Sequence, residues 1–318
     1  MERPLVSIIT PCYNGERYLN RYFQSILNQT YSHLELIFIN DGSMDKTEEI
    51  ALSYQSKFEQ KGIRFIYLYQ DNEGQASALN KGLKVFSGDF LTWPDSDDVM
   101  SVECIEKKVN FMVNNNCKIC LCTTAIVNEN QPDKIVGYFK RIISENEYDD
   151  FFEDIIFLNN VYFAPGGYMV SADAFLDVIP DRNIFQGRGG QNAQILLPIL
   201  YKYHCKYMSD VLYTYYIRED SHSHTIYNAH DEITQIELYV TIILETLKKI
   251  GINVFEKYEN RVKSHYAHIC YGNSLGTDDM QLISNYYNML KNLKCITILE
   301  RMRYFKRVIC NLIKSFAR

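Results

Sequence analysis

Long hydrophobic runs are missing from this sequence. No stretch approaches the ~20 apolar residues that a membrane-spanning helix needs. The opening segment MERPLVSIITPCYNGER has too short an apolar run for a secretory signal peptide. Internal repeats and low-complexity segments are also absent. These absences exclude an integral helical membrane protein and a repeat protein, and we expect a cytoplasmic protein.

The familiar glycine-rich loops that bind phosphate are missing as well. No G-x-G-x-x-G follows the first apolar segment, and G-x-x-x-x-G-K-[ST] occurs nowhere. The stretch GRGG (Gly187–Gly190) stands in the wrong context for such a loop, and its signal is weak. A dinucleotide-binding protein and a P-loop enzyme are therefore excluded.

The sequence also lacks an excess of positive charge and a pattern of paired cysteines. With 33 Lys and Arg against 39 Asp and Glu, the net charge is −6, which argues against a nucleic-acid partner. The nine cysteines are scattered, and we expect free thiols in a reducing compartment. Cys117, Cys120 and Cys122 have no second Cys or His pair at zinc-finger spacing, so buried core thiols are the favoured interpretation.

What the sequence does contain is an alternation of strand and helix patterns. With 318 residues, 47% of them apolar, the chain can form one large domain with an appendage. Short apolar runs predict strands at Leu5–Thr10, Leu34–Ile39, Ile63–Tyr69 and Asp89–Trp93. Helices are predicted at Glu16–Gln29, Asp45–Gln60 and Gln75–Phe86. This alternation predicts an α/β fold with an open, mostly parallel sheet flanked by helices.

Polar clusters follow each of the four predicted strands. In parallel sheets, ligands bind beyond the carboxyl ends of the strands, so these clusters predict one cleft. The most crowded cluster holds Asp95, Asp97 and Asp98, which repel one another unless a cation lies among them. Mg²⁺ or Mn²⁺ prefers carboxylate oxygens and often shares a phosphate ligand, so we interpret the cluster as a metal site. The alternative is that Asp98 caps a helix beginning near Ser101.

Four motifs in order give the sequence a family resemblance: SIITPCYNGERYL, INDGSMDKT, NEGQASALNKGL and WPDSDD. Together they resemble the family 2 glycosyltransferases, which have the GT-A fold. The resemblance is strong over Leu5–Val99 and weak to about Arg218. It implies transfer of a sugar from a nucleotide-diphosphate donor, usually with a divalent cation and with inversion at the anomeric carbon.

The resemblance also assigns roles to residues. It implies that Tyr13 lies near the nucleobase, that Asp41 accepts a hydrogen bond from a pyrimidine N–H, and that Asp97 ligates the metal. Asp95 would lie near the ribose and sugar as a catalytic residue. The expected nucleotide-binding residues are Pro11, Tyr13, Asn14, Asp41, Asn72, Gly74, Asn80, Asp95 and Arg218. Gly82 would help to shape the wall of the donor site, and Arg218 would clamp the diphosphate. His222 or His224 is a candidate extra metal ligand, with a solvated loop as the alternative.

Two departures from the family pattern concern the third motif and the catalytic base. Leu79 stands where many relatives carry Arg, and Gln191 and Asn192 stand where many have Glu-Asp. An amide cannot act as a general base. Either Gln191 and Asn192 bind the acceptor while Asp181 or Asp173 serves as base, or the acceptor needs little activation, or this helix is unrelated. We favour the first account and leave the base unassigned.

The predicted organisation has two parts. Residues 1–228 would form the GT-A catalytic domain, with a nucleotide-binding half (1–99) and an acceptor half (100–228), and residues 229–318 a helical C-terminal region. The resulting hypothesis is a hexosyltransferase that uses a UDP-sugar and Mn²⁺ or Mg²⁺ to extend a glycan, a glycoprotein or a lipid-linked acceptor in bacterial surface polysaccharide or glycoprotein assembly. The alternatives are a nucleotidyltransferase, whose glycine-rich basic signature is missing, and a nucleotide-sugar-binding scaffold without transferase activity.

The last segment, Ile298–Arg318, has its own pattern. Apolar residues recur at spacings of four and three: Ile298, Met302, Phe305, Ile309, Leu312 and Phe316. Six basic residues face a single acid, Glu300, so the segment carries net +5 and the rest of the chain −11. The pattern fits a peripheral contact with the inner face of a membrane, and it fits equally a helix docked on its neighbours or on another subunit of a homo-oligomer.

Overall fold

The computed structural model describes residues 3–141, 151–159, 164–184, 190–218 and 228–316. The chain forms two compact units, residues 1–224 and 225–318. In the first unit the strands are β1 (Val6–Cys12), β2 (Leu34–Asp41), β3 (Arg64–Gln70), β4 (Phe90–Thr92), β5 (Val99–Met100), β6 (Ile119–Asn128), β7 (Gln131–Phe139), β8 (Tyr168–Ser171) and β9 (Cys205–Ile217). Its helices are α1 (Leu19–Leu27), α2 (Thr47–Ser53), α3 (Gln55–Gln60), α4 (Gln75–Leu83), α5 (Cys104–Asn114), α6 (Phe151–Phe157), α7 (Ala172–Val178) and α8 (Gln191–Lys202), with a 3-10 turn at Pro165–Gly167.

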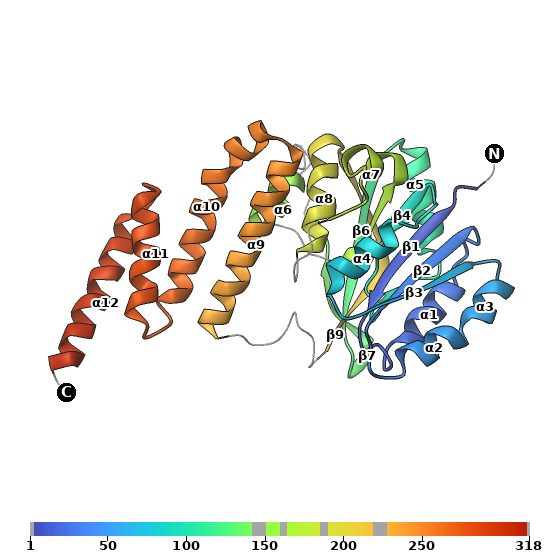
Figure 1. The fold of residues 1–318 in the computed structure, drawn as a ribbon, viewed down its shortest axis with the longest axis horizontal. Coiled ribbons are helices and arrows are strands. Elements are labelled where there is room, and N and C mark those ends of the chain that lie inside the picture. The colour runs from blue at the N-terminus through green and yellow to red at the C-terminus, as the bar shows by residue number, and fades with distance from the viewer. Residues whose placement is uncertain (1–2, 142–150, 160–163, 185–189, 219–227, 317–318) are drawn as a thin grey trace. The chain divides into compact units, whose positions relative to one another are not determined.

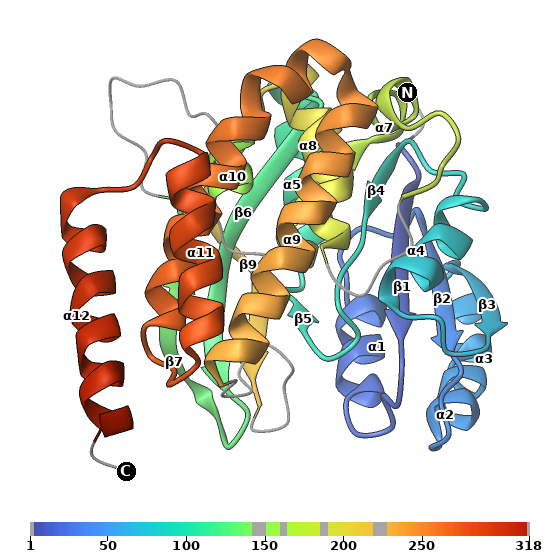
Figure 2. The same cartoon turned by 60° about the vertical axis from the view of Figure 1, so that its left-hand side comes forward.

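The strands of the first unit form one sheet in the order β3-β2-β1-β4-β8-β6-β9-β5, with β7 added beside β6. The pairs β2–β3, β1–β2, β1–β4 and β6–β9 are parallel, and they have most of the paired residues. The strands β8, β5 and β7 join in antiparallel directions. Figures 1 and 2 show the four strands β3, β2, β1 and β4 side by side, as the predicted open α/β sheet requires.

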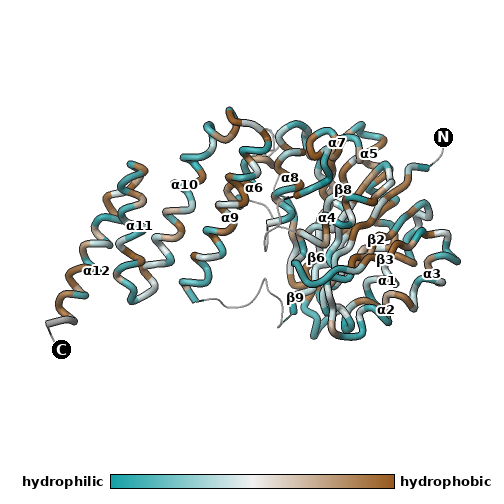
Figure 3. The backbone as a smooth tube through the Cα atoms, viewed as in Figure 1, coloured by the Kyte–Doolittle hydropathy of each residue, from teal (hydrophilic) through white to brown (hydrophobic). Residues whose placement is uncertain are grey.

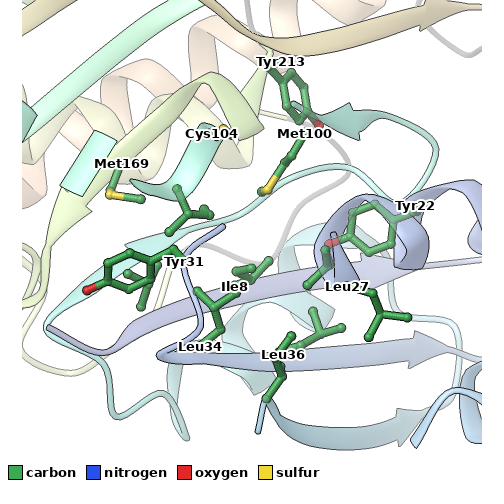
Figure 4. Close-up of a cluster of buried hydrophobic side chains, with 14 of the residues drawn as sticks. Ile8, Tyr22, Leu27, Tyr31, Leu34, Leu36, Met100, Cys104, Met169 and Tyr213 are labelled. Carbon is green, nitrogen blue, oxygen red and sulfur yellow. The ribbon is translucent and has the colours of Figure 1, made fainter. Parts of the chain in front are cut away.

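Helices cover both faces of the parallel half. Alternate residues of each strand point to opposite faces, so each face has its own set of side chains that pack against helices. On one face Ile8, Leu36 and Phe38 pack with α1, α2, α3 and α5 in a buried cluster that includes Phe23, Tyr31 and Cys104. Figure 4 shows part of this cluster. On the other face α4 lies close to the sheet: a Cβ added at Gly82 would come within 2.3 Å of Ile9 Cγ2. Gly82 therefore permits the approach of α4 to β1.

The predicted elements differ from the observed ones by one to three residues at most of their ends, and two further differences concern Pro11 and Tyr54. The first strand continues through Pro11 to Cys12. Pro11 has no backbone N–H to donate, but β4 pairs with β1 only from Val6 to Ile8 and therefore needs none at this position. The helix predicted over Asp45–Gln60 is divided at Tyr54 into α2 and α3. The nine cysteines are free thiols, and Cys120 and Cys122 are buried in β6, as expected for core thiols, whereas Cys117 precedes β6 and is only partly buried.

The second unit consists of helices α9 (Ala229–Ile250), α10 (Ile252–Ser274), α11 (Met280–Asn292) and α12 (Ile298–Phe316). Each of these helices packs on the next in sequence. Asn228 caps α9 and Asp279 caps α11, each accepting two backbone N–H bonds. Ile283, Tyr286 and Leu290 of α11 pack against Ala267 and Tyr271 of α10 in the core. The all-helical C-terminal region is confirmed. Within the described residues, none of the helices has the length and apolar character to span a membrane.

Candidate functional site

The loops that follow β1 and β2 are bonded to each other. Asn14 N–H donates to Ser43 Oγ (2.9 Å), and Asn14 Oδ1 accepts from Met44 N–H (3.0 Å). Asn14 has a positive φ of 51°, a conformation that asparagine tolerates better than most residues. Its neighbour Tyr13 is 47% exposed, whereas Pro11 is buried within β1. Asn14 therefore supports the loop and leaves the ring of Tyr13 open to a ligand.

Asp41, at the carboxyl end of β2, holds the loop that follows β3. Its Oδ1 accepts from Gln70 Nε2 (2.7 Å) and Glu73 N (3.1 Å), and its Oδ2 accepts from Gly74 N (3.0 Å). The side chain is 3% exposed. A carboxylate has about four acceptor positions, so Oδ2 keeps capacity for one more donor. Asn72, within the same loop, has an exposed side chain.

Asn80 is engaged with the chain itself. Its amide nitrogen donates to Ile184 O (2.9 Å), and its Oδ1 accepts from Ile184 N (2.8 Å), with 2% of the residue exposed. Both ends of the amide are thereby used to anchor the segment that leads toward α8. The structure gives Asn80 a supporting position, and direct nucleotide contact by this residue stays a prediction.

Three carboxyl groups converge just beyond β4. Ligand oxygens of Asp95, Asp97 and Asp98 all lie within 4.8 Å of one another. Asp98 is 1% exposed; its Oδ1 accepts from Tyr216 N (3.1 Å), and its Oδ2 has no hydrogen-bond partner. Asp98 does not cap a helix, because α5 begins at Cys104 and has no side-chain cap. The alternative of a helix cap at Asp98 is therefore wrong.

Burial and the crowding of the three carboxyl groups in this aspartate cluster raise the pKa values of two of them. Burial, followed by the charge of Asp97, raises the pKa of Asp95 to about 7, although the hydrogen bond from Gln75 and the charge of Arg218 lower it. Burial and the charges of Asp97 and Asp95 raise the pKa of Asp98 well above its ordinary value. A cation among the three carboxylates would reverse both shifts.

Two arginines supply positive charge beside the aspartate cluster. Arg218 Nη2 forms an ion pair with Asp97 Oδ2, and its guanidinium lies 4.5 Å from the ring centre of Tyr18. Arg21 Nη2 donates to the backbone oxygen of Asp97 (2.6 Å), with its guanidinium 3.6 Å from the ring centre of Tyr216. The structure thus brings Arg218, a predicted site residue, to the predicted metal ligand Asp97.

A chain of amides links α8 to the aspartate cluster. Gln191 Nε2 donates to Gln75 Oε1 (2.7 Å), and Gln75 Nε2 donates to Asp95 Oδ1 (2.8 Å). Gln191 Oε1 is buried and has no hydrogen-bond partner. Beside it, Asn192 Oδ1 accepts from the indole N–H of Trp93 (2.9 Å). The structure therefore brings Gln191 and Asn192 together with Asp95.

Sequence reasoning missed Gln75, Arg21 and Tyr213. Tyr213, on β9, accepts a hydrogen bond from Asp95 N (3.2 Å) through its hydroxyl. Gly166 makes room for it, because a Cβ there would come within 2.1 Å of the tyrosine ring. Gln75 could have been found from its place in the first turn of the helix after β3. No signal in the sequence indicates Arg21 or Tyr213.

The two carboxylates considered as the base lie elsewhere. Asp173 pairs with Lys118 and follows Ala172, whose N–H donates to Asp89 O at the amino end of β4. Asp181 is exposed and precedes Arg182, which donates to carbonyl groups at the C-terminal end of α4. The aspartate cluster lies at the opposite ends of β4 and α4, so neither residue is brought to it. His222, His224 and Gly187–Gly189 lie outside the described residues.

The pattern of four strand-end loops around an aspartate cluster has a counterpart among known proteins. Residues 7–177, more than half of the chain, match the model of glycosyl transferase family 2. The chain belongs to this family. A relative of this chain is an uncharacterized glycosyltransferase of Rickettsia typhi, 41% identical over 128 residues, which are 40% of this chain and 38% of that protein. The chain therefore spans well under half the length of that relative.

Solved structures show the same fold for this family 2 glycosyltransferase. Residues 1–349 of Staphylococcus aureus TarS, in complex with UDP-GlcNAc, match with a TM-score of 0.62 at 15% identity, over 95% of this chain and 89% of that one. The mannosyltransferase PcManGT of Pyrobaculum calidifontis, in complex with GDP-Man and Mn²⁺, matches with a TM-score of 0.53 at 13% identity, over 99% and 88%. These likenesses confirm the predicted GT-A fold.

Proposed function

We propose that this glycosyltransferase transfers a sugar, with inversion, from a UDP-sugar to a glycan, glycoprotein or lipid-linked acceptor. A Mn²⁺ or Mg²⁺ ion would be held at the aspartate cluster. The observation that carries the proposal is the cluster itself, in which an unpartnered buried oxygen of Asp98 lies beside Asp95 and Asp97. The neighbours TarS, in complex with UDP-GlcNAc, and PcManGT, with Mn²⁺, support the donor class and the metal.

The chemistry of the donor set fits a hard divalent cation. Asp97, 21% of whose side chain is exposed, would be the main ligand, and Asp98 Oδ2 offers a second oxygen. When bound, such an ion neutralises the charge that develops on a leaving diphosphate. Arg218 can add charge-assisted hydrogen bonds to the same phosphates. Asp95, bonded to Gln75, would be oriented toward the ribose and the sugar.

Asp41 is expected to serve the nucleoside end of the donor. We expect Asp41→Asn to weaken UMP and UDP binding by similar factors, on the order of tenfold to a hundredfold, because one charged acceptor of a hydrogen bond is lost. Titration calorimetry with each nucleotide measures both affinities. Gln70→Ala is the matched control: it removes one hydrogen bond to Asp41 Oδ1 and leaves the carboxylate in place. A loss for UDP without a loss for UMP would show that Asp41 recognises phosphate or metal instead.

Gln191 and Asn192 are expected to serve the acceptor side. Their replacement by Ala should lower the transfer rate about tenfold or more and leave UDP affinity within about threefold, because each offers one or two hydrogen bonds to the acceptor. Gln75→Ala is the comparison variant, since Gln191 reaches Asp95 through Gln75. If Gln191→Ala and Gln75→Ala have equal effects that do not add in the double variant, Gln191 acts through Asp95, and its acceptor role is wrong.

The donor class can be tested with a thermal-shift panel of nucleotide sugars in the presence of Mn²⁺. We expect UDP-sugars to raise the melting temperature. Nucleoside triphosphates, which carry no donor sugar, should raise it no more than UDP does. The amides at Gln191 and Asn192 favour one second candidate, a nucleotide-sugar-binding scaffold without transferase activity. The scaffold would show the same stabilisation but no release of UDP, with or without acceptor.

A further inference from the structure

Helix α12 is anchored to the second unit by one of its faces. The ring of Tyr304 stacks on that of Tyr287 with centroids 3.8 Å apart. Glu300 Oε1 is hydrogen-bonded to His268 Nδ1 (2.5 Å), and the backbone oxygen of Glu300 accepts a hydrogen bond from the hydroxyl of Tyr271 (2.9 Å). Arg307 donates to the backbone oxygen of Leu275. These contacts fix which side of α12 meets its neighbours.

The opposite face of α12 exposes a stripe of large apolar side chains. Its members recur at spacings of four and three, so they share one helical face. They are between 51% and 80% exposed: Ile298, Met302, Phe305, Ile309 and Leu312. We call this set the apolar stripe. The alternation of hydropathy along α12 can be followed in Figure 3. Burial within the bundle therefore does not account for these residues.

Exposed basic side chains flank the apolar stripe. Arg301, Arg303 and Lys306 are exposed, and the one acidic residue of α12, Glu300, is already engaged by His268. Charge is also divided unequally between the two units. Residues 225–318 carry 13 basic and 9 acidic side chains, net +4, and residues 1–224 carry 20 and 30, net −10. The exposed face of α12 is thus apolar at its centre, with Arg301 and Lys306 at its two margins and Arg303 further round the helix on the side of Lys306.

We propose that α12 docks on an anionic lipid surface. The helix would lie in the plane of the interface, with the apolar stripe among the acyl chains and Arg301, Arg303 and Lys306 against lipid phosphates. A second copy of the chain fits less well. Pairing two apolar stripes would bring the basic margins of both helices together, with no acidic residue on α12 left to offset them. This proposal goes beyond the transfer reaction and does not depend on it.

Co-sedimentation of the full chain with vesicles tests the proposal. We expect binding to vesicles of phosphatidylglycerol mixed equally with phosphatidylcholine, and much weaker binding to phosphatidylcholine alone. Each basic residue near an anionic surface accounts for roughly a fivefold change in affinity. Replacing Arg301, Arg303 and Lys306 together by Gln should weaken binding on the order of a hundredfold, and Phe305→Ser with Ile309→Ser by about tenfold or more.

Matched controls come from the same unit. Lys248, Lys249 and Lys291 are exposed lysines on α9 and α11, and their joint replacement by Gln removes the same charge from other helices. Ile252→Ser with Met289→Ser removes exposed apolar side chains from α10 and α11. Both controls should bind vesicles within about twofold of wild type. Because all the changed side chains are exposed, unfolding transitions should coincide for all variants.

Three results would overturn the proposal. The first is equal sedimentation with anionic and neutral vesicles, and the second is an equal loss of vesicle binding in the α12 variants and their controls. The third is a concentration-dependent dimer, seen by analytical ultracentrifugation, that Phe305→Ser with Ile309→Ser abolishes while wild type does not sediment with vesicles. That result would assign the apolar stripe to self-association. UDP affinity without vesicles should be unchanged in every α12 variant, so this test is independent of the proposed transfer reaction.

Discussion

Asp97→Asn is expected to reduce the affinity for UDP in the presence of Mn²⁺ by more than about a hundredfold. Replacing a residue that only orients a metal ligand typically lowers metal affinity about 10–100-fold. The loss should be larger for Asp97, because Asp97 is proposed as the ligand itself. The substitution keeps the size of the side chain and removes the charge that a divalent cation requires. Burial, the largest cause of their raised pKa values, still acts on the remaining Asp95 and Asp98 in this variant, and a protonated carboxyl group is a poorer ligand.

Titration calorimetry with UDP, in Mn²⁺ and in EDTA, measures this effect. Asp133→Asn is the control, since Asp133 is an exposed carboxylate on β7 outside the aspartate cluster. It should leave the Mn²⁺-dependent affinity unchanged. If Asp97→Asn also leaves that affinity unchanged, the metal is bound elsewhere and the site is wrong.

Arg218→Ala is expected to change metal and nucleotide binding in opposite directions. Arg218 is paired with Asp97, so it competes for the carboxylate that the metal needs. Its removal should strengthen the binding of Mn²⁺ alone, by up to about fivefold for a partly exposed ion pair. The binding of UDP at saturating Mn²⁺ should weaken on the order of tenfold to a hundredfold, because a charge-assisted hydrogen bond to the diphosphate is lost.

The sign of the two changes is the informative result for Arg218. Mn²⁺ binding is measured by titration without nucleotide, and UDP binding at saturating Mn²⁺. Arg17→Ala is the control: Arg17 is an arginine with an exposed side chain that pairs with Glu129. If Arg218→Ala weakens both ligands equally, its role is to support the loop. If UDP affinity is unchanged, Arg218 does not reach the diphosphate.

The arrangement of the donor half could be predicted from sequence because its signals are local. Each strand of the parallel half is a short apolar run, Asp41 is the last residue of β2, and the aspartate cluster begins within three residues of the end of β4. Parallel strands place their carboxyl ends at one edge, so linear order was sufficient to predict that these loops meet. The observed registers β1–β2 and β2–β3 bring this about.

The partners of the aspartate cluster could not be predicted in this way. Asp98 accepts a hydrogen bond from Tyr216 and Asp95 N donates to Tyr213, each 118 residues distant in sequence. These contacts depend on β9 pairing in parallel with β6 and antiparallel with β5, which no local pattern specifies. The link from Gln191 through Gln75 to Asp95 similarly requires the packing of α8.

Helix α12 shows a different limit. The spacing of Met302, Phe305 and Ile309 predicted an amphipathic helix, and the helix is present. The same spacing suits a stripe that packs inward and one that faces outward, so sequence alone left both interpretations open. Only the contacts of Tyr304 and Glu300 show that another face of the helix is docked.

The release of UDP from UDP-sugars, with Mn²⁺ and with EDTA, tests most directly whether the aspartate cluster is a metal-dependent donor site. For wild type we predict release of UDP in Mn²⁺, its loss in EDTA and its return when Mn²⁺ is restored, with Asp97→Asn inactive throughout. Equal release in Mn²⁺ and in EDTA, or full activity of Asp97→Asn, would contradict the account.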